Sequence, residues 1–91
     1  MVLHLGSDCF VTMQNVLMIL DYKEATVNED TVNFLKGIPK VNICDDIRPK
    51  AFIIVEEEGD KKAYISPISP ATLFKRGAGD GWSTLFTPAE D

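Results

Sequence analysis

The chain has 91 residues, a formal net charge of −5, two cysteines and one histidine. This length predicts a single domain, and no apolar run approaches the roughly 20 residues that a membrane-spanning helix needs. The acidic balance argues against nonspecific binding to nucleic acid, which depends on cations that neutralise phosphates.

Short apolar segments bounded by turn signals predict six strands. A stretch of a few apolar residues between Gly, Pro, Asn or Asp residues has the length and the boundaries of a strand. The segments that fit are residues 1–5, 9–13, 16–20, 41–44, 51–57 and 61–66. Turns at Gly6-Ser7-Asp8 and Glu58-Gly59-Asp60 predict that the first two and the last two strands form hairpins. The run 16–20 is continuously apolar, which favours a buried strand.

Two segments carry the start and stop signals of short helices. The first covers residues 28–36, where Asn28 can cap the helix and Gly37 follows the last turn. The second begins at Ser69-Pro70, with proline at the first helical position, and ends at Gly77.

These elements predict an α+β fold for residues 1–76, with a small, mostly antiparallel sheet and two short helices. Residues 77–91 begin with Gly-Ala-Gly-Asp-Gly and predict a flexible C-terminal tail. The tail contains Trp82, Leu85 and Phe86. These three side chains fit either a loose apolar patch on the domain or a peptide that docks on a partner.

The strand over residues 51–57 is apolar on both faces. Phe52 and Ile54 point to one side of it, and Ile53 and Val55 point to the other. Both faces must therefore be covered. The two helices can cover one face, and either a second sheet or a neighbouring copy of the chain can cover the other.

The residues predict no catalytic, metal or cofactor site. The single histidine, His4, has no nearby Ser or Cys in a motif context, and zinc would need four ligands at recurring short spacings. The acidic run 56–60 lacks the spacing of a calcium loop. The glycines of residues 77–81 lack the lysine and hydroxyl of a phosphate loop. We therefore expect a protein that is not an enzyme and that takes no small-molecule substrate.

The two cysteines, Cys9 and Cys44, stand beside apolar residues and have no partner at motif spacing. They are expected to be free structural thiols, because free cysteines commonly behave as small hydrophobic residues. The first residues do not have the pattern of a signal peptide, which predicts the reducing cytoplasm.

The basic residues include three pairs. Arg48 and Lys50 flank Pro49, Lys61 and Lys62 follow the second turn, and Lys75 and Arg76 end the last helix. Each pair is either an ordinary solvent-facing charge or part of a phosphate-binding surface. In a homo-oligomer each pair repeats once per subunit, so modest local contacts can add up despite the acidic total.

Three segments in order resemble the RemA/RemB family of bacterial matrix-gene regulators, and RemB above all. They are His4-Leu5-Gly6 with Phe10-Val11, then Pro49-Lys50 before an apolar strand, and then Tyr64 to Ser69 followed by Thr72-Leu73 and Lys75-Arg76. The resemblance covers about residues 1–76. It implies a cytoplasmic transcription regulator of biofilm matrix genes that assembles into homo-oligomeric rings and binds double-stranded DNA through arginines.

By position, the resemblance implies that Arg48 and Lys50 contact DNA. Lys75 and Arg76 match the basic end of the family segment, where no individual role can be transferred. The chain departs from the family at two places. Gln14-Asn15 stand where family members carry an arginine, and Asp45-Asp46-Ile47 stand where RemA-type chains are more basic. These changes leave an alternative open: a non-enzymatic oligomeric scaffold or protein-interaction module that has lost much of the DNA-binding surface.

Overall fold

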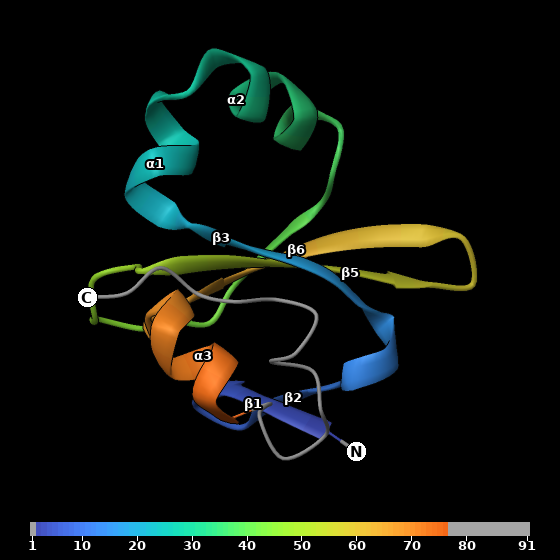
Figure 1. Cartoon of the computed structure of the whole chain (residues 1–91), viewed down its shortest axis with the longest axis vertical. Coiled ribbons are helices and arrows are strands. Elements are labelled where there is room, and N and C mark those ends of the chain that lie inside the picture. The colour runs from blue at the N-terminus through green and yellow to red at the C-terminus, as the bar shows by residue number, and fades with distance from the viewer. Residues whose placement is uncertain (1, 77–91) are drawn as a thin grey trace.

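The computed structural model describes residues 2–76, and the expected flexible tail with Trp82 lies outside the described residues. All six predicted strands are present, as are both predicted helices (Figure 1). The strands are β1 (Val2–Gly6), β2 (Cys9–Thr12), β3 (Val16–Asp21), β4 (Lys40–Asn42), β5 (Ala51–Glu57) and β6 (Asp60–Ser66). The helices are α1 (Tyr22–Val27), α2 (Glu29–Lys36) and α3 (Pro70–Arg76), with a 3₁₀ turn η1 at Met13–Asn15.

Helix α1 is the element that the sequence prediction missed, so the expected number of two helices was wrong. Strand β3 runs directly into α1 at Asp21, whose carboxylate accepts a hydrogen bond from the Glu24 amide at 3.0 Å. Asn28 then ends α1 and caps α2, where its side chain accepts from the Thr31 amide at 3.0 Å. No Gly or Pro separates these elements, so the only local signals at the two boundaries are the capping residues Asp21 and Asn28.

The α+β fold with a mostly antiparallel sheet is confirmed. The main sheet has the order β3-β5-β6-β4, and only the β4–β6 pair is parallel. Strands β1 and β2 form a separate antiparallel hairpin, which lies below the main sheet in Figure 1.

Strand β3 is not the buried strand that its apolar run predicted. It pairs with β5 on one side only and forms an edge of the main sheet. Leu17 is 39% exposed and Met18 is 37% exposed, because the two positions lie on a strand without a second neighbour.

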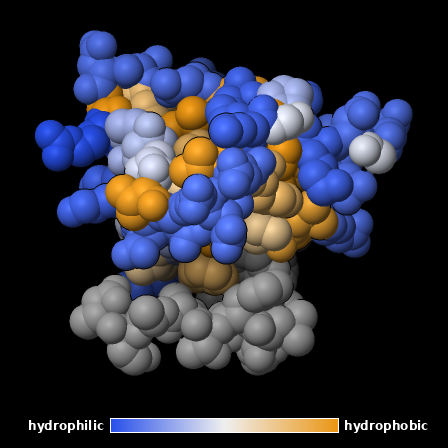
Figure 2. All heavy atoms as spheres, turned by 90° about the horizontal axis from the view of Figure 1, so that it is seen from above, coloured by the Kyte–Doolittle hydropathy of each residue, from blue (hydrophilic) through white to orange (hydrophobic). Residues whose placement is uncertain are grey.

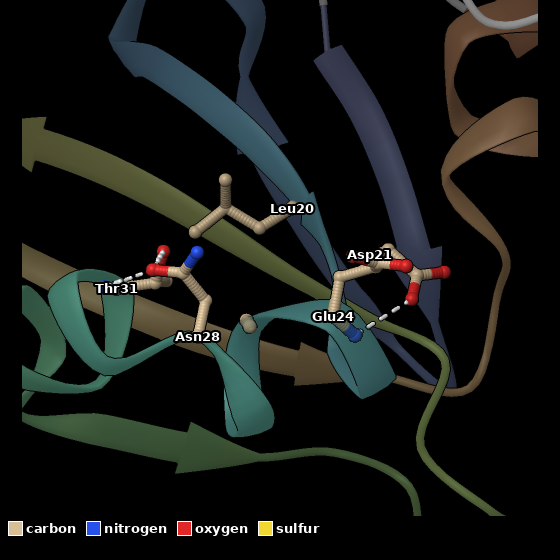
Figure 3. Close-up of a pocket in the computed structure, with 6 residues that line it drawn as sticks. Leu20, Asp21, Glu24, Asn28 and Thr31 are labelled. Atoms are coloured by element: carbon tan, nitrogen blue, oxygen red, sulfur yellow. Dashed lines mark hydrogen bonds between the residues drawn. The ribbon is translucent and has the colours of Figure 1, made fainter.

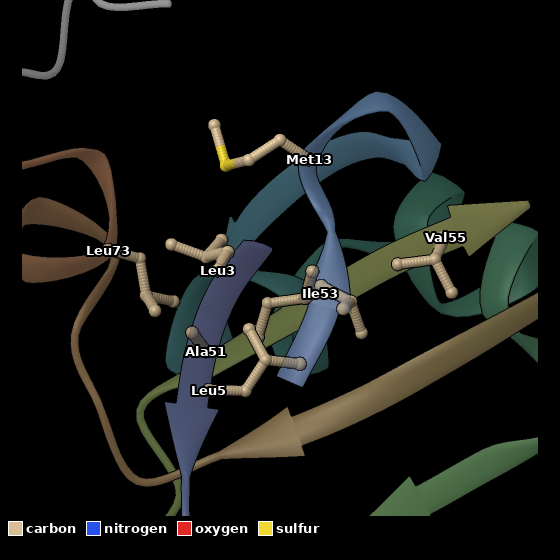
Figure 4. Close-up of a cluster of buried hydrophobic side chains, with 8 residues drawn as sticks. Leu3, Leu5, Met13, Ala51, Ile53, Val55 and Leu73 are labelled. Carbon is tan, nitrogen blue, oxygen red and sulfur yellow. The ribbon is translucent and has the colours of Figure 1, made fainter. Parts of the chain in front are cut away.

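The two faces of β5 are covered by the same chain, and all of Ala51–Val55 are buried. On one face, Ile53 and Val55 belong to a cluster that β1, β2 and α3 complete through Leu3, Leu5, Val11 and Leu73 (Figure 4). On the other face, Phe52 and Ile54 belong to a cluster with Ala25 and Leu35 of α1 and α2. The expectation that the two predicted helices cover one face was therefore wrong: α2, together with α1, covers the Phe52 face, whereas α3 lies with the β1–β2 hairpin on the Ile53 face. Because the chain itself covers both faces, β5 needs no neighbouring copy for its burial.

Ser66 is the one buried polar residue among those described, and it joins three parts of the chain. Its hydroxyl donates to the Leu5 carbonyl of β1 at 2.5 Å and accepts from the Ile68 amide at 3.0 Å. Its carbonyl accepts from the Lys50 amide at 2.8 Å. The hairpin and the entry to α3 thus meet at the Ser66 side chain, and the loop before β5 is bonded to the backbone of the same residue.

Candidate nucleic-acid interface

Arg48 and Lys50 lie in the loop between β4 and β5, and both are exposed. The backbone of Lys50 is held on two sides, because its amide donates to Ser66 and its carbonyl accepts from the Tyr22 amide at 3.0 Å. Neither side chain hydrogen-bonds or ion-pairs with any residue of the described chain. The structure therefore presents two uncommitted cations on a fixed stretch of backbone.

Lys75 and Arg76 are exposed at the C-terminal end of α3. Arg76 is partly engaged, since its guanidinium donates to the His4 carbonyl of β1 at 2.9 Å. Lys75 forms no hydrogen bond or ion pair within residues 2–76. Of the four residues expected at a DNA surface, three are thus free and one is anchored to the hairpin.

His4 orients the Arg76 guanidinium as well as binding it. The His4 Nε2 atom lies 2.8 Å from the Ser7 carbonyl oxygen, which can only accept, so Nε2 carries a proton. In the neutral ring the Nδ1 atom is then the acceptor, and the Arg76 guanidinium lies 3.5 Å from it. The His4 ring also stacks on Phe10, with a distance of 4.6 Å between ring centroids.

The two basic segments lie on elements that touch. Lys50 is hydrogen-bonded to Ser66, Ser66 is hydrogen-bonded to Leu5, and His4 beside Leu5 holds Arg76. Figure 1 shows α3 next to the end of the sheet where the β4–β5 loop turns. The sequence prediction treated these pairs as separate and missed the His4, Phe10 and Arg76 cluster. The sequence does carry one signal for this cluster. Residues alternate between the two faces of the hairpin, and this alternation pairs His4 with Phe10 across the two strands.

Gln14 and Asn15, where the family pattern has an arginine, lie at the opposite end of β5. The Asn15 amide donates to the Glu57 carboxylate at 3.3 Å, and Glu57 is the last residue of β5. Lys50 precedes the first residue of that strand, so the two places are roughly 20 Å apart. Glu57, Glu58 and Asp60 are exposed at the far end, which makes it locally acidic.

Residues 1–76 hold all nine Lys and Arg residues and eleven of the fourteen acids, so their formal net charge is −2. Residues 77–91 contribute the remaining −3 and contain no Lys or Arg. The part of the chain that carries the candidate interface is therefore much less acidic than the total suggests. A phosphate near Arg48 and Lys50 would respond to the electrostatic potential at those two side chains more than to the net charge of the whole chain.

A hollow of about 210 Å³ lies between β3, α1 and α2 (Figure 3). Its polar groups include Asp21 and Asn28, whose side-chain oxygens already accept hydrogen bonds from the first-turn amides of α1 and α2. In the chain from residue 2 to 76, no three His, Cys, Asp or Glu side chains are grouped so as to hold a metal ion. None of the helices in that part is long and apolar enough to cross a membrane.

Both thiols are free; Cys44 is buried and Cys9 is half-buried. Burial raises the pKa of the Cys44 thiol, and the nearby Asp45 charge raises it further, so the thiolate is disfavoured. Burial also raises the pKa of Cys9. Cys44 is only 2% exposed, and its thiol lies 3.3 Å from the Ile65 carbonyl oxygen that accepts its hydrogen bond.

We expect the native protein at pH 8 to react with a thiol reagent much more slowly than the unfolded protein, and Cys44 to react last. A raised pKa leaves less thiolate at that pH, and burial blocks access. Cys9→Ser and Cys44→Ser variants assign the two phases, and denatured samples give the reference rate. Fast labelling of Cys44 in the native protein would contradict this placement.

The sequence matches no protein-family model. A search of curated proteins also finds no match.

Proposed function

We propose that the protein is a cytoplasmic, non-enzymatic DNA-binding transcription regulator of the RemA/RemB type that acts as a ring-like homo-oligomer. The observation that supports it most is the pair Arg48 and Lys50, which are exposed and uncommitted on a loop with a fixed backbone. Such side chains contact phosphates and position a protein on a duplex without reading bases. Lys75 adds a third free cation on the neighbouring helix.

Assembly is what turns these few cations into a binding surface. A single copy offers a small basic area on a domain of net charge −2, which is too little for tight binding at ordinary salt. Repetition around a ring multiplies the contacts, and a duplex that touches several subunits gains from their effective concentration. The family pattern places basic residues at both ends of β5, at positions 14–15 and at positions 48–50. These two places would approach each other only across a boundary between subunits.

We expect the double variant Arg48→Ala, Lys50→Ala to lose tenfold or more in affinity for a double-stranded oligonucleotide. Each lost phosphate contact should also lower the slope of log affinity against log salt by about 0.9. Fluorescence anisotropy of labelled duplex at two or more salt concentrations measures both quantities. Light scattering with and without duplex gives the mass of the assembly.

The matched control is Lys61→Ala, Lys62→Ala, which removes the same charge at the acidic β5–β6 turn. This control should keep most of the affinity. Equal losses in the two variants would show a nonspecific charge effect. No binding of the wild-type protein at low salt would rule out the DNA-binding function.

A scaffold or protein-interaction module is the second candidate, and the edge strand β3 favours it. Its exposed Leu17 and Met18 lie on a strand with one unpaired edge, which is a template for pairing with another chain. A hollow of about 210 Å³ beside it is lined by Met18, Leu20, Asp30, Thr31 and Phe34. Elsewhere the face that carries α1 and α2 is mostly hydrophilic, with separate small apolar groups (Figure 2). A stable oligomer that shifts no duplex at any salt concentration would select this function.

A further inference from the structure

The outer side of the β1–β2 hairpin carries an apolar surface that no described residue covers. We call it the hairpin face and define it by Val2, His4, Phe10 and Thr12, which alternate with the buried Leu3, Leu5 and Val11. Val2 is 57% exposed and Phe10 is 58% exposed. The Phe10 ring is nevertheless held in place, because it stacks on His4. A fixed and exposed aromatic ring is a preformed stacking surface.

One edge of the hairpin face is cationic. The Arg76 guanidinium lies against it through the 2.9 Å hydrogen bond to the His4 carbonyl, and Lys75 precedes it in α3. The hairpin itself contributes one acid, Asp8, in the exposed turn between its strands. An acidic and aromatic segment would therefore complement this surface better than a basic one.

The chain itself supplies such a segment. Residues 77–91 follow Arg76 directly, so they begin at the cationic edge of the hairpin face. They contain Trp82, Leu85 and Phe86, three acids and no Lys or Arg. Trp82 is six residues beyond Arg76, a stretch that can span up to about 20 Å. A short tether of this kind gives an effective concentration in the millimolar range, so weak contacts suffice.

We propose that residues 82–86 dock on the hairpin face of their own chain, with Trp82 packed against Phe10 and the tail acids near Lys75 and Arg76. Docking removes the largest exposed aromatic surface of the hairpin from water. It also occupies the cationic end of α3. The inference rests on the exposure, the charges and the chain path, and it holds whether or not the protein binds DNA.

Trp82 is the only tryptophan, so its fluorescence in the full chain reports the tail alone. We expect its emission to be shifted to the blue, and its quenching by acrylamide to be weaker, relative to a synthetic peptide of residues 77–91. Phe10→Ser should return both signals to those of the peptide. Lys75→Glu should move them part of the way, because it reverses one complementary charge.

Val27→Ser is the matched control, since Val27 is 76% exposed on α1, away from the hairpin. It should leave the emission unchanged. Circular dichroism confirms that Phe10→Ser remains folded, and Val2→Ser provides a second change on the same face. A full-chain emission equal to that of the peptide would overturn the proposal.

Two further outcomes would also overturn it. If Phe34→Ser shifts the emission and Phe10→Ser does not, the tail docks on the hollow beside β3 instead. If the blue shift disappears on dilution, the tail docks on a second copy and not on its own chain.

Discussion

Replacing Ile53 with alanine is expected to lower the free energy of unfolding by about 2–5 kcal/mol. Ile53 is fully buried at the centre of β5, in the cluster that joins the hairpin and α3 to the main sheet. The truncation loses the transfer free energy of the removed atoms and leaves a cavity that packed neighbours fill only in part. Domains of this size are stable by only about 5–15 kcal/mol, so the variant should lie close to its unfolding threshold.

Urea unfolding followed by circular dichroism measures this loss. Val27→Ala is the control, because Val27 is 76% exposed and exposed substitutions usually change stability by less than about 0.5 kcal/mol. All samples need the same protein concentration, since self-association makes the apparent stability depend on it. An Ile53→Ala variant as stable as the control would mean that β5 is not the centre of the fold.

Replacing Ser66 with alanine is expected to cost about 1–3 kcal/mol, although it removes a single oxygen atom. The Ser66 hydroxyl serves both the Leu5 carbonyl and the Ile68 amide, and the change removes the partner that each has there. An unpaired group in the interior loses its hydrogen bond to water without a replacement. The substitution should weaken the contact between the β1–β2 hairpin and the main sheet, and it should leave the main sheet itself intact.

Hydrogen exchange separates these two effects. In Ser66→Ala the amides of β1 and β2 should exchange faster, whereas those of α2 should keep their protection. Val27→Ala, at a site that is 76% exposed on α1, is the control and should change stability little. Unchanged exchange in the hairpin would show that the apolar cluster alone holds it to the sheet.

Several local features of the sequence were sufficient to predict elements of the fold. Gly6 and Gly59 adopt positive φ angles of 118° and 85° in the two hairpin turns, where glycine is the least strained residue. Asn28 caps α2 and Ser69 accepts a hydrogen bond from the Thr72 amide at 3.3 Å at the start of α3, as predicted. These signals act over three or four residues, so they can be read directly from the chain.

For the candidate interface, the sequence predicted the exposure of single residues but not the contacts between them. The exposure of Arg48 and Lys50 follows from a polar loop before an apolar strand. The contact between His4 and Arg76 joins positions 72 residues apart, and no periodicity connects them. It exists because α3 packs on β1 through Leu73 and the hairpin, which is a property of the assembled core.

The sequence by itself determined the six strands, the helices over residues 28–36 and 70–76, and the apolar character of both faces of β5. The tertiary structure alone decided that β3 is an edge, that α1 continues from it, and that the hairpin folds under the sheet. The reason is physical: capping and alternation are local, whereas strand order depends on which distant apolar faces bury one another. Ile53 pairs with Ile19 on one side and with Tyr64 on the other, and only the folded chain brings those residues together.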